Sequence, residues 1–541
     1  MKTALTTELL QRLPRGVACL TIVLLASLVT KFAATAQSAE TNCTVQVQLL
    51  PAGSTAARVR VIGSDQKFSA PADAIVRKTT REEDYFYADN TFAVSVPKGV
   101  THFYFSAGLE SIPSHITMDV QSDITLPVPI NRWIEMRERG WYGGDSHVHL
   151  HTGGPLAVTV KDALVAARAE GLHYSNLCVS NNVGDDIRDA SLITGKPHPL
   201  STANHLLVFG EEMRSSIYGH MQFFGIRELV TPQYTGFLDT PNHHDYPANY
   251  TMAAEAVRQG GIVTYGHPMF KDQPLPFGDD LTADNGAARE LPIDAILGVA
   301  HAVDLMSYNS DEDRSAELWY RLLNCGLKLA ACVGTDALLD RSTDPLGGSR
   351  VYVQVDGPLT MNKWLTGLKQ GRSLVTNGPI PQLTIAGKGP GDTCQLKEQG
   401  TVRAHVNVES YTPFHRVDLI VNGKVVNSRK TSENAEANGF RLSRYHVDVP
   451  ITRSSWVAVR VHGPDHPAIF DGPAWAHTSP VYVSLQQQPI VHREDAEYFV
   501  DWIGRLLRVV ATRDRYAEAA DRQRVEKLFQ QAQQKFRQLA E

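Results

Sequence analysis

Three histidines stand at alternate positions in the run WYGGDSHVHLHTGG, where they are His147, His149 and His151. In an extended strand, residues i and i+2 point to the same side, so His147 and His149 would direct two imidazoles toward one point. On a helix, the same spacing would turn the two side chains apart. Two such histidines either bind a metal ion or form a polar strand face, and this run alone leaves both interpretations open.

Further candidate ligands follow other apolar segments of the chain. Glu212 comes after HLLVFG, His267 after IVTYG and Asp336 after LKLAACVGT, while His220 lies in the run YGHMQFFG. Active-site groups of α/β barrels gather at the C-terminal ends of the strands. Histidine and carboxylate side chains supply the nitrogen and oxygen donors that suit Zn²⁺, Mn²⁺ or Fe. We therefore predict a metal centre formed by His147, His149, Glu212, His220, His267 and Asp336.

The segments that carry these residues repeat a pattern of helix, glycine and short apolar strand over residues 138–380. VKDALVAARAEG precedes YSNLCVS, TMAAEAVRQGG precedes IVTYGHP, and SAELWYRLLNCG precedes LKLAACVGTD. The helical segments have apolar residues at three-and-four spacing and a glycine at the C-terminal end. The strands are apolar without alternation, which is typical of parallel strands covered on both faces. This pattern predicts an α/β barrel or a related parallel sheet.

Both flanks of this region have β character. Residues 37–137 contain short alternating strands separated by Gly, Pro and Asp, which predict a small all-β domain. Residues 381–486 predict a β-sandwich, in which Asn422 and Gly423 indicate a hairpin. Residues 487–541 predict amphipathic helices whose apolar stripe packs on the rest of the protein.

The N-terminal segment has the order of a secretory signal. Basic residues between Lys2 and Arg15 precede an apolar run, and Ala34 and Ala36 then stand at A-x-A spacing. The apolar run is about 14 residues long, which is short for a membrane span. We expect cleavage of residues 1–36 and export to the periplasm or the medium, with an uncleaved anchor as the alternative. No later segment is long and apolar enough to cross a bilayer.

The overall composition is that of a soluble globular protein, with 43% hydrophobic and 20% charged residues. A net charge of −6 provides no basic field, so we expect a small-molecule substrate and no nucleic-acid partner. The five cysteines beyond the signal are scattered without a C-x-x-C pair, which favours buried thiols and at most one disulfide. The sequence leaves the oligomeric state open.

Taken together, GDSHVH, GEE…GH, GHP and GTD resemble the PHP superfamily of metal-dependent hydrolases, and most closely its CehA/McbA-type family. LKQGRSLVTNGP resembles the end of that family's barrel, and the Asn-Gly hairpin and SPVYV resemble its C-terminal β domain. The resemblance covers nearly the whole mature chain. It implies a distorted (β/α)7 barrel flanked by N- and C-terminal β-sandwich-like domains.

The resemblance also implies how the ligands divide between metal ions. Glu212 would bridge two ions, and the family's Gly-x-Glu spacing from Gly210 favours it over the alternative, Glu211. The first ion would be held by His147, His149, Glu212 and Asp336, and the second by Glu212, His220 and His267.

Three departures from the superfamily pattern fall on a third metal site. The run HTGGPLAV lacks the usual carboxylate, Asn181 and Asn182 replace a histidine after the next strand, and Leu338 replaces the histidine of Asp-x-His. His151 is either a replacement ligand for that site or a histidine outside the centre, and the second interpretation is favoured. We therefore expect about two divalent ions per chain, of Zn, Mn or Fe.

Three further residues are candidates for catalysis. Asp145 either orients a ligating histidine or is a turn residue after two glycines. Arg214 and Tyr218 lie in the segment between the Glu and His ligands, where they either stabilise an oxyanion or are exposed loop residues.

These observations predict a secreted or periplasmic two-metal hydrolase. Paired cations lower the pKa of a bound water, so that a metal-activated hydroxide can attack a phosphoester, carboxyl ester, amide or carbamate near neutral pH. The chain has neither a G-x-S-x-G motif nor a nucleotide-binding glycine motif, so it offers no competing serine nucleophile or nucleotide site. The alternative is a non-catalytic, metal-containing barrel that acts as a carbohydrate- or surface-binding module.

Overall fold

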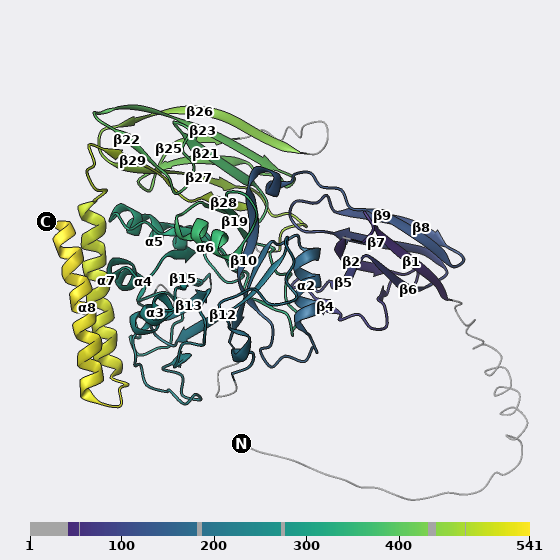
Figure 1. The fold of residues 1–541 in the computed structure, drawn as a ribbon, viewed down its shortest axis with the longest axis horizontal. Helices are drawn as coiled ribbons and strands as arrows, with labels where there is room; N and C mark the ends of the chain where they lie inside the picture. The colour runs from purple at the N-terminus through teal and green to yellow at the C-terminus, as the bar shows by residue number, and fades with distance from the viewer. Residues whose placement is uncertain (1–41, 54, 181–186, 272–275, 431–439, 471) are drawn as a thin grey trace, which may run out of the picture.

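The computed structural model describes residues 42–53, 55–180, 187–271, 276–430, 440–470 and 472–541. The predicted signal segment, Asn181 and Asn182 lie outside these described residues. Figure 1 shows a β lobe from the N-terminal part of the chain beside a central α/β body. A second β lobe covers one edge of the body, and a pair of long helices packs along its far side.

The N-terminal lobe consists of two small sheets packed face to face. One sheet has the strand order β6-β1-β9, and the other has the order β4-β5-β2-β7-β8 with β3 paired to β2. Alternate residues of β1, such as Val45 and Val47, are fully buried between the sheets, as expected for strands with one solvent face. The strands are β1 (Asn42–Leu50), β2 (Ala56–Ile62), β3 (Phe68–Ser69), β4 (Arg77–Lys78), β5 (Asp84–Asp89), β6 (Thr91–Pro97), β7 (Gly99–Ser106), β8 (Ser114–Val120) and β9 (Ile124–Pro129).

The central body is built on a curved sheet that starts at β10. Strands β10, β11 and β12 are parallel, as are β15, β16 and β17, and β18 pairs with β10 so that the sheet curves back on itself. Its strands are β10 (Trp141–His149), β11 (Tyr174–Val179), β12 (Leu206–Ser215), β13 (Gly219–Phe224), β14 (Tyr234–Thr235), β15 (Ile262–Tyr265), β16 (Ala302–Asp304), β17 (Ala330–Cys332), β18 (Ala337–Leu338), β19 (Arg350–Gln354) and β20 (Ser373–Thr376).

The mixed α/β character predicted for this region is confirmed, but the purely parallel sheet is not. Strand β13 runs antiparallel to both β12 and β15, and β19 runs antiparallel to β10. A buried strand is apolar whichever way its neighbours run, so the sequence pattern could not separate the two arrangements. The sheet forms a half-barrel, and the complete (β/α)7 barrel stays a prediction.

The helices of the body cover the outer side of this sheet. In α2, the Thr159 side chain accepts a hydrogen bond from the backbone N–H of Asp162, and the Asp162 carboxylate accepts one from the backbone N–H of Thr159, which fixes the start of the helix. In α5, Asp311 caps the first turn, and the buried residues include Trp319 and Leu322. The elements are η1 (Met136–Arg139), α2 (Val160–Ala169), η2 (Ala190–Leu192), α3 (Asn249–Arg258), α4 (Leu291–Leu297), α5 (Glu312–Asn324) and α6 (Met361–Lys369).

The C-terminal lobe continues the central sheet, because β20 pairs with β28. A three-stranded sheet, β21-β23-β26, packs against it, and both central residues of the Asn422-Gly423 turn have positive φ, as the hairpin pattern predicts. The strands are β21 (Ile380–Ile385), β22 (Thr393–Leu396), β23 (Gly400–Ser410), β24 (Arg416–Val421), β25 (Lys424–Lys430), β26 (Arg441–Ile451), β27 (Ser455–His462), β28 (Trp475–Thr478) and β29 (Val481–Leu485).

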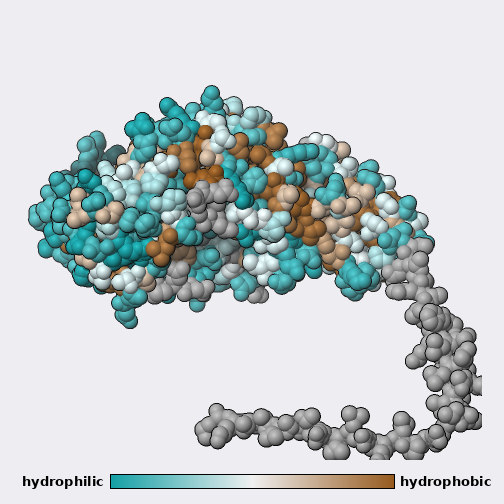
Figure 2. Space-filling model, turned by 90° about the horizontal axis from the view of Figure 1, so that it is seen from below, coloured by the Kyte–Doolittle hydropathy of each residue, from teal (hydrophilic) through white to brown (hydrophobic). Residues whose placement is uncertain are grey.

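Two helices, α7 (Arg493–Arg513) and α8 (Ala519–Ala540), form an antiparallel pair against the body. Their apolar residues, including Phe499 and Phe529, are buried in the same core as the central sheet. Seen from below, the end of the molecule formed by this pair is mostly hydrophilic, whereas hydrophobic residues gather toward the middle and over the N-terminal lobe (Figure 2). Among the helices that the structure describes, none has the length and apolar content needed to cross a membrane.

The described cysteines are all free and buried: Cys43, Cys178, Cys325, Cys332 and Cys394. The N-terminal lobe contacts the loop that follows Asp336, since Thr80 donates two hydrogen bonds to Asp344 at 2.9 and 2.7 Å and Tyr85 donates one to the carbonyl of Thr343 at 3.0 Å. These contacts join the lobe to the part of the body that carries a predicted ligand.

Candidate metal centre

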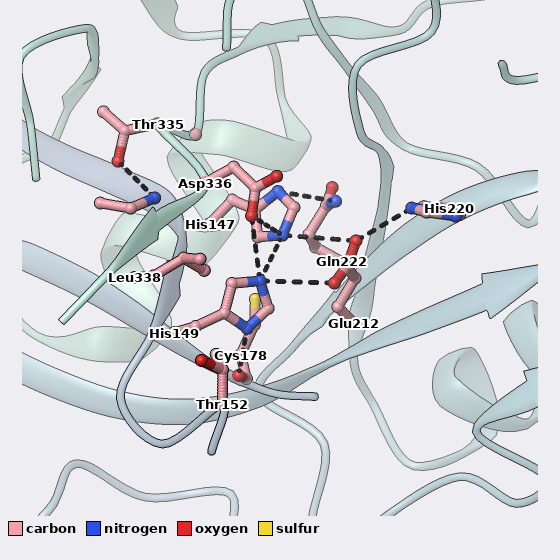
Figure 3. Close-up of polar contacts among 12 residues, drawn as sticks. His147, His149, Thr152, Cys178, Glu212, His220, Gln222, Thr335, Asp336 and Leu338 are labelled. Carbon is pink, nitrogen blue, oxygen red and sulfur yellow. Dashed lines mark hydrogen bonds and ion pairs between the residues drawn. The ribbon is translucent and has the colours of Figure 1, made fainter. Parts of the chain in front are cut away.

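Strand β10 brings two of the predicted histidines together. All nine of its residues are buried, so both faces of the strand are covered. His147 Nε2 and His149 Nε2 lie 3.0 Å apart, and both rings are fully buried (Figure 3). The convergence expected from the i, i+2 spacing is therefore present in the folded protein.

Two carboxylates lie next to this histidine pair. Glu212 Oε1 lies 3.5 Å from His147 Nε2, and Glu212 Oε2 lies 3.3 Å from His149 Nε2. Asp336 Oδ1 lies 3.3 Å from His147 Nε2 and 3.1 Å from His149 Nε2. Glu212 is 1% exposed, whereas the side chain of Asp336 is 29% exposed and marks the more open side of the cluster.

The other two histidines face Glu212 from its opposite side. His220 Nδ1 lies 3.2 Å and His267 Nε2 3.8 Å from Glu212 Oε1. Two groups have ligand atoms that all lie within 4.8 Å of one another, and His147 belongs to both. One group is His147, His149 and Asp336, and the other is His147, Glu212 and His267.

The neighbouring Glu211 points away from this cluster. Its Oε2 accepts a hydrogen bond from the backbone of Val230 at 2.7 Å, and burial raises the pKa of the carboxyl well above its usual value. Successive side chains of a strand point to opposite faces, so only one of the two glutamates can reach the histidines. Of the two alternatives left by the sequence, Glu212 is the one beside the predicted ligands.

Tight turns place His267 and Asp336 after their strands. Both have positive φ, 28° and 60°, which is uncommon for residues other than glycine. Each turn also has a glycine on which a side chain would collide, with Gln222 at Gly266 and with His147 at Gly334. The two turns therefore lie directly against the histidine-bearing strands.

Asp145 holds the backbone of the centre. It is fully buried and accepts hydrogen bonds from the backbone N–H of His147, Thr335 and Gly347 at 3.1, 3.0 and 2.7 Å, and from the Thr335 hydroxyl at 2.6 Å. Asp145 thus ties β10 to the turn before Asp336. It positions the predicted ligands through their backbone and makes no hydrogen bond to an imidazole ring.

Of the other two catalytic candidates, one lies at the cluster and the other does not. Arg214 Nε donates to Glu212 Oε2 at 2.6 Å. Tyr218 instead donates its hydroxyl hydrogen bond to the carbonyl of Asp245 at 3.0 Å and lies 2.8 Å from the hydroxyl of Tyr516. These contacts join a turn of the body to the C-terminal helix pair, and the catalytic role of Tyr218 stays a prediction.

His151 lies outside the cluster. Its Nδ1 is 2.7 Å from Asp189 Oδ2, and its Nε2 is 2.9 Å from the carbonyl of Val158, so both ring nitrogens have other partners. At the position of the absent third-site histidine, Leu338 pairs with His149 across the sheet and supplies only an apolar side chain.

Charges and hydrogen bonds within the cluster shift the pKa values of its side chains. Burial alone would lower the pKa of His149, but hydrogen bonds and charge from Asp336 and Glu212 raise it to about 9. Burial would raise the pKa of Glu212, but Arg214 and His147 hold it well below its usual value. Burial would also raise the pKa of Asp336, but His147 and His149 hold it well below its usual value. Both carboxylates thus favour the ionised form that ligates a cation, and a cation bound there would displace the proton of His149.

The donor set fits divalent cations. His149 Nδ1 lies 3.0 Å from the backbone carbonyl of Cys178, which can only accept a hydrogen bond. Once a cation has displaced its other proton, the neutral ring would keep the Nδ1 proton and direct the Nε2 lone pair into the cluster. Imidazole nitrogens and carboxylate oxygens in this number match the ligand preferences of Zn²⁺, Mn²⁺ and Fe²⁺. The six predicted residues could therefore hold cations where they stand.

Comparison with known proteins gives weak structural likenesses. No protein-family model and no curated protein matches the chain. The lesion-specific endonuclease PfuEndoQ from Pyrococcus furiosus aligns with a TM-score of 0.28 at 14% identity, over 42% of this chain and 56% of that one. Endonuclease Q in complex with a 27-mer duplex containing an abasic lesion aligns with a TM-score of 0.27 at 13% identity, over the same shares.

The alignment thus spans little more than half of the length of these endonucleases. A similarity this low carries no argument about the family or the reaction of this chain.

The DNA in one of these structures corrects the expectation that nucleic acid is excluded as a partner. That expectation rested on the net charge of −6, which is a sum over the whole chain. Bound cations are often the largest local charges in a site and attract phosphate whatever the net charge of the protein. Net charge is therefore the wrong criterion for a centre of this kind.

Two residues near the centre escaped the sequence reasoning. Asp304 ends β16, is fully buried, and accepts hydrogen bonds from the backbone of Met306 and Gly334, both at 3.2 Å. Asp304 directly follows the apolar run HAV, and this position at the end of a strand indicates it in the same way as it indicates Glu212 and Asp336. Gln222 follows His220 by two residues on β13 and lies beside His147, and the strand period of two could have indicated it.

Proposed function

We propose that this protein is a divalent-metal-dependent hydrolase with a two-metal centre. The observation that carries the proposal is the position of Glu212, whose Oε1 faces His147, His220 and His267 while its Oε2 faces His149. A carboxylate shared in this way can hold two cations at the separation used by hydrolytic two-metal sites, roughly 3.5–4 Å.

In this proposal the first cation would bind between the β10 histidines and Asp336, and the second between His220 and His267, with Glu212 on both. Cations bound there would lower the pKa of a water molecule and polarise the oxygen that gains charge during hydrolysis.

The residues on the more exposed side of the centre would receive the substrate. The side chains of Asp336, Arg214 and His220 are 29%, 18% and 17% exposed, whereas His147, His149 and Glu212 are almost completely buried. Arg214 is held against Glu212, which keeps its guanidinium beside the cluster and available to attract an anionic substrate oxygen. The fully buried side of the centre would exclude water behind the reacting group.

The bond cleaved is proposed to be a phosphoester, carboxyl ester, amide or carbamate, in keeping with the motif resemblance to the CehA/McbA-type family. Export to the periplasm or medium is proposed from the order of basic, apolar and small residues at the N-terminus. N-terminal sequencing of the exported protein should give a chain that begins after Ala36. A chain that still begins at Met1 would instead indicate an anchor.

A substrate panel tests the proposed reaction. Protein stripped of metal would be given Mn²⁺ or Zn²⁺ together with nitrophenyl esters of phosphate, acetate and carbamate, and with a DNA duplex that contains an abasic site. We expect cation-dependent hydrolysis of at least one of these, lost in His147→Ala and in Asp336→Ala while the far-UV circular dichroism is unchanged. His151→Ala is the matched control and should retain activity.

Metal that stays bound without turnover on any substrate would contradict the hydrolase proposal and favour the alternative of a binding module. Loss of folding in His147→Ala and Asp336→Ala would mean that these residues support the fold.

A further inference from the structure

The two histidines of β10 contact different kinds of hydrogen-bonding group. His149 Nδ1 lies 3.0 Å from the backbone carbonyl of Cys178, which has no alternative orientation. His147 Nδ1 lies 3.2 Å from the side-chain amide of Gln222, whose nitrogen Nε2 faces the ring. A carbonyl can only accept, whereas an amide presents a donor on one side and an acceptor on the other.

Gln222 lies among the strands and turns that carry the predicted ligands. It is fully buried on β13, where it pairs directly with Glu212 on one side and Thr264 on the other. Its amide occupies the space that a side chain at Gly266 would need, immediately before His267. The amide therefore lies between the strand that carries Glu212 and the turn that carries His267, with His147 in front of it.

This orientation of the Gln222 amide leaves its oxygen without a hydrogen-bond partner. With Nε2 toward His147, the Gln222 Oε1 atom is buried without a hydrogen-bond partner. In that orientation Gln222 donates to His147 Nδ1, so a neutral His147 ring carries its proton on Nε2. That proton would point at His149, Glu212 and Asp336, where a cation would need a lone pair.

We propose that Gln222 is a positioning residue for the metal centre, and that with a cation bound its amide oxygen accepts a hydrogen bond from His147 Nδ1–H. The oxygen and nitrogen of an amide occupy nearly the same space, so Oε1 can take the place of Nε2 beside the ring. That hydrogen bond leaves the Nε2 lone pair of His147 directed into the cluster. This inference rests on the proposed two-metal function, and it assigns Gln222 a role that the ligands themselves do not fill.

Metal affinity provides a test that does not depend on turnover. Zn²⁺ dissociation constants of the full-length protein would be measured by competition with a chromogenic chelator, with elemental analysis for stoichiometry. Gln222→Met keeps the size of the side chain and removes the acceptor, so Zn²⁺ binding should weaken by about 10- to 100-fold. Gln222→Glu restores an acceptor for Nδ1–H, and its affinity should return to within a few-fold of the wild type, roughly that of carboxylate–histidine–metal arrangements.

Gln233→Met is the matched control. Gln233 is also a buried glutamine, 2% exposed, but its amide nitrogen bonds to the carbonyl of Val179 and not to an imidazole. This variant should bind Zn²⁺ as the wild type does. Equal affinity in wild type and Gln222→Met would overturn the proposal, and so would Gln222→Glu binding as weakly as Gln222→Met, because both results indicate a residue that only fills space.

A spectroscopic measurement covers the case in which Gln222→Met does not fold. In Zn²⁺-loaded wild type with ¹⁵N-labelled histidine, His147 should show a protonated Nδ1 and a metal-bound Nε2. An unprotonated Nδ1 would sink the inference. A wild type that takes up no Zn²⁺ contradicts the proposed function and this inference together, whereas Zn²⁺ uptake that is indifferent to Gln222 contradicts the inference alone.

Discussion

The carboxylate of Asp145 accepts two hydrogen bonds from Thr335, one from its backbone N–H at 3.0 Å and one from its hydroxyl at 2.6 Å. Through this pair, the strand that carries His147 is fixed to the turn that carries Asp336. Because the same carboxylate also accepts from the backbone of His147 and Gly347, every lone pair that faces these donors is in use.

Asp145→Asn should therefore destabilise the protein and loosen the first cation. The new amide nitrogen would face a buried N–H or O–H donor, and leaving such a donor unpaired costs about 1–3 kcal/mol. We expect a lower melting temperature in the metal-free protein and a weaker Zn²⁺ affinity, measured by calorimetry and by chelator competition. Unchanged values for both would show that Asp145 is not needed to hold the turn.

The number of cations can be counted in ligand variants. Wild type should hold about two ions per chain, Glu212→Gln should lose most of both because it serves both, and His267→Ala should lose mainly one. Elemental analysis of the purified proteins measures this directly. Three equivalents in wild type, or one equivalent that His267→Ala does not change, would contradict the ligand assignment.

Tyr218→Phe should affect stability and leave the centre intact. The hydroxyl bonds to Asp245 and Tyr516, so its removal should cost about 1 kcal/mol of unfolding free energy, as for a neutral hydrogen bond. Combining it with Tyr516→Phe should cost less unfolding free energy than the sum of the two single changes, because each single change already removes the same hydrogen bond between the two hydroxyls. Urea titration measures these values, and a drop in Zn²⁺ stoichiometry in Tyr218→Phe would support the sequence prediction of a role at the site.

Stability should fall on acidification because several histidines are buried as neutral rings. Burial lowers their pKa in the folded protein, whereas the unfolded chain keeps ordinary values near 6.5, so between about pH 4 and pH 6.5 the unfolded state binds more protons. The free energy of unfolding should therefore decrease as the pH falls through this window. These histidines are His173 and His477, with pKa values of about 3, and His205 and His301, with pKa values of about 4.

Urea unfolding of the metal-free protein at about pH 7.5 and about pH 5 checks this pH dependence. His301→Gln removes one of the titrating groups and should reduce the difference between the two conditions. Equal stability at both pH values would mean that these rings are accessible to protons in the folded state.

The residues of the cluster could be predicted because each follows an apolar strand, and such positions meet at one edge of an α/β sheet. His267 and Asp336 could be identified in this way, although nothing in the neighbouring sequence indicates their positive φ. The direction of β13 and β19 could not be predicted, because a buried strand is apolar beside parallel and antiparallel neighbours alike.

The surroundings of Tyr218 could not be predicted, for a different reason. The residue lies between Glu212 and His220 in the sequence, in the turn between β12 and β13. Its hydroxyl bonds to the carbonyl of Asp245 and lies beside the hydroxyl of Tyr516. Its partner Tyr516 is 298 residues away along the chain, and no local pattern reports a contact of that range.

That long-range contact has a consequence for how the protein is made. The turn between Glu212 and His220 is anchored by a residue that leaves the ribosome 298 positions after Tyr218. A nascent chain that already contains all six predicted ligands still lacks this anchor, and so does a product of premature termination within α7. Docking of this turn on the helix pair is therefore expected only once synthesis is complete, and a nonsense mutation within α7, far from any ligand, is expected to lower the stability of the body.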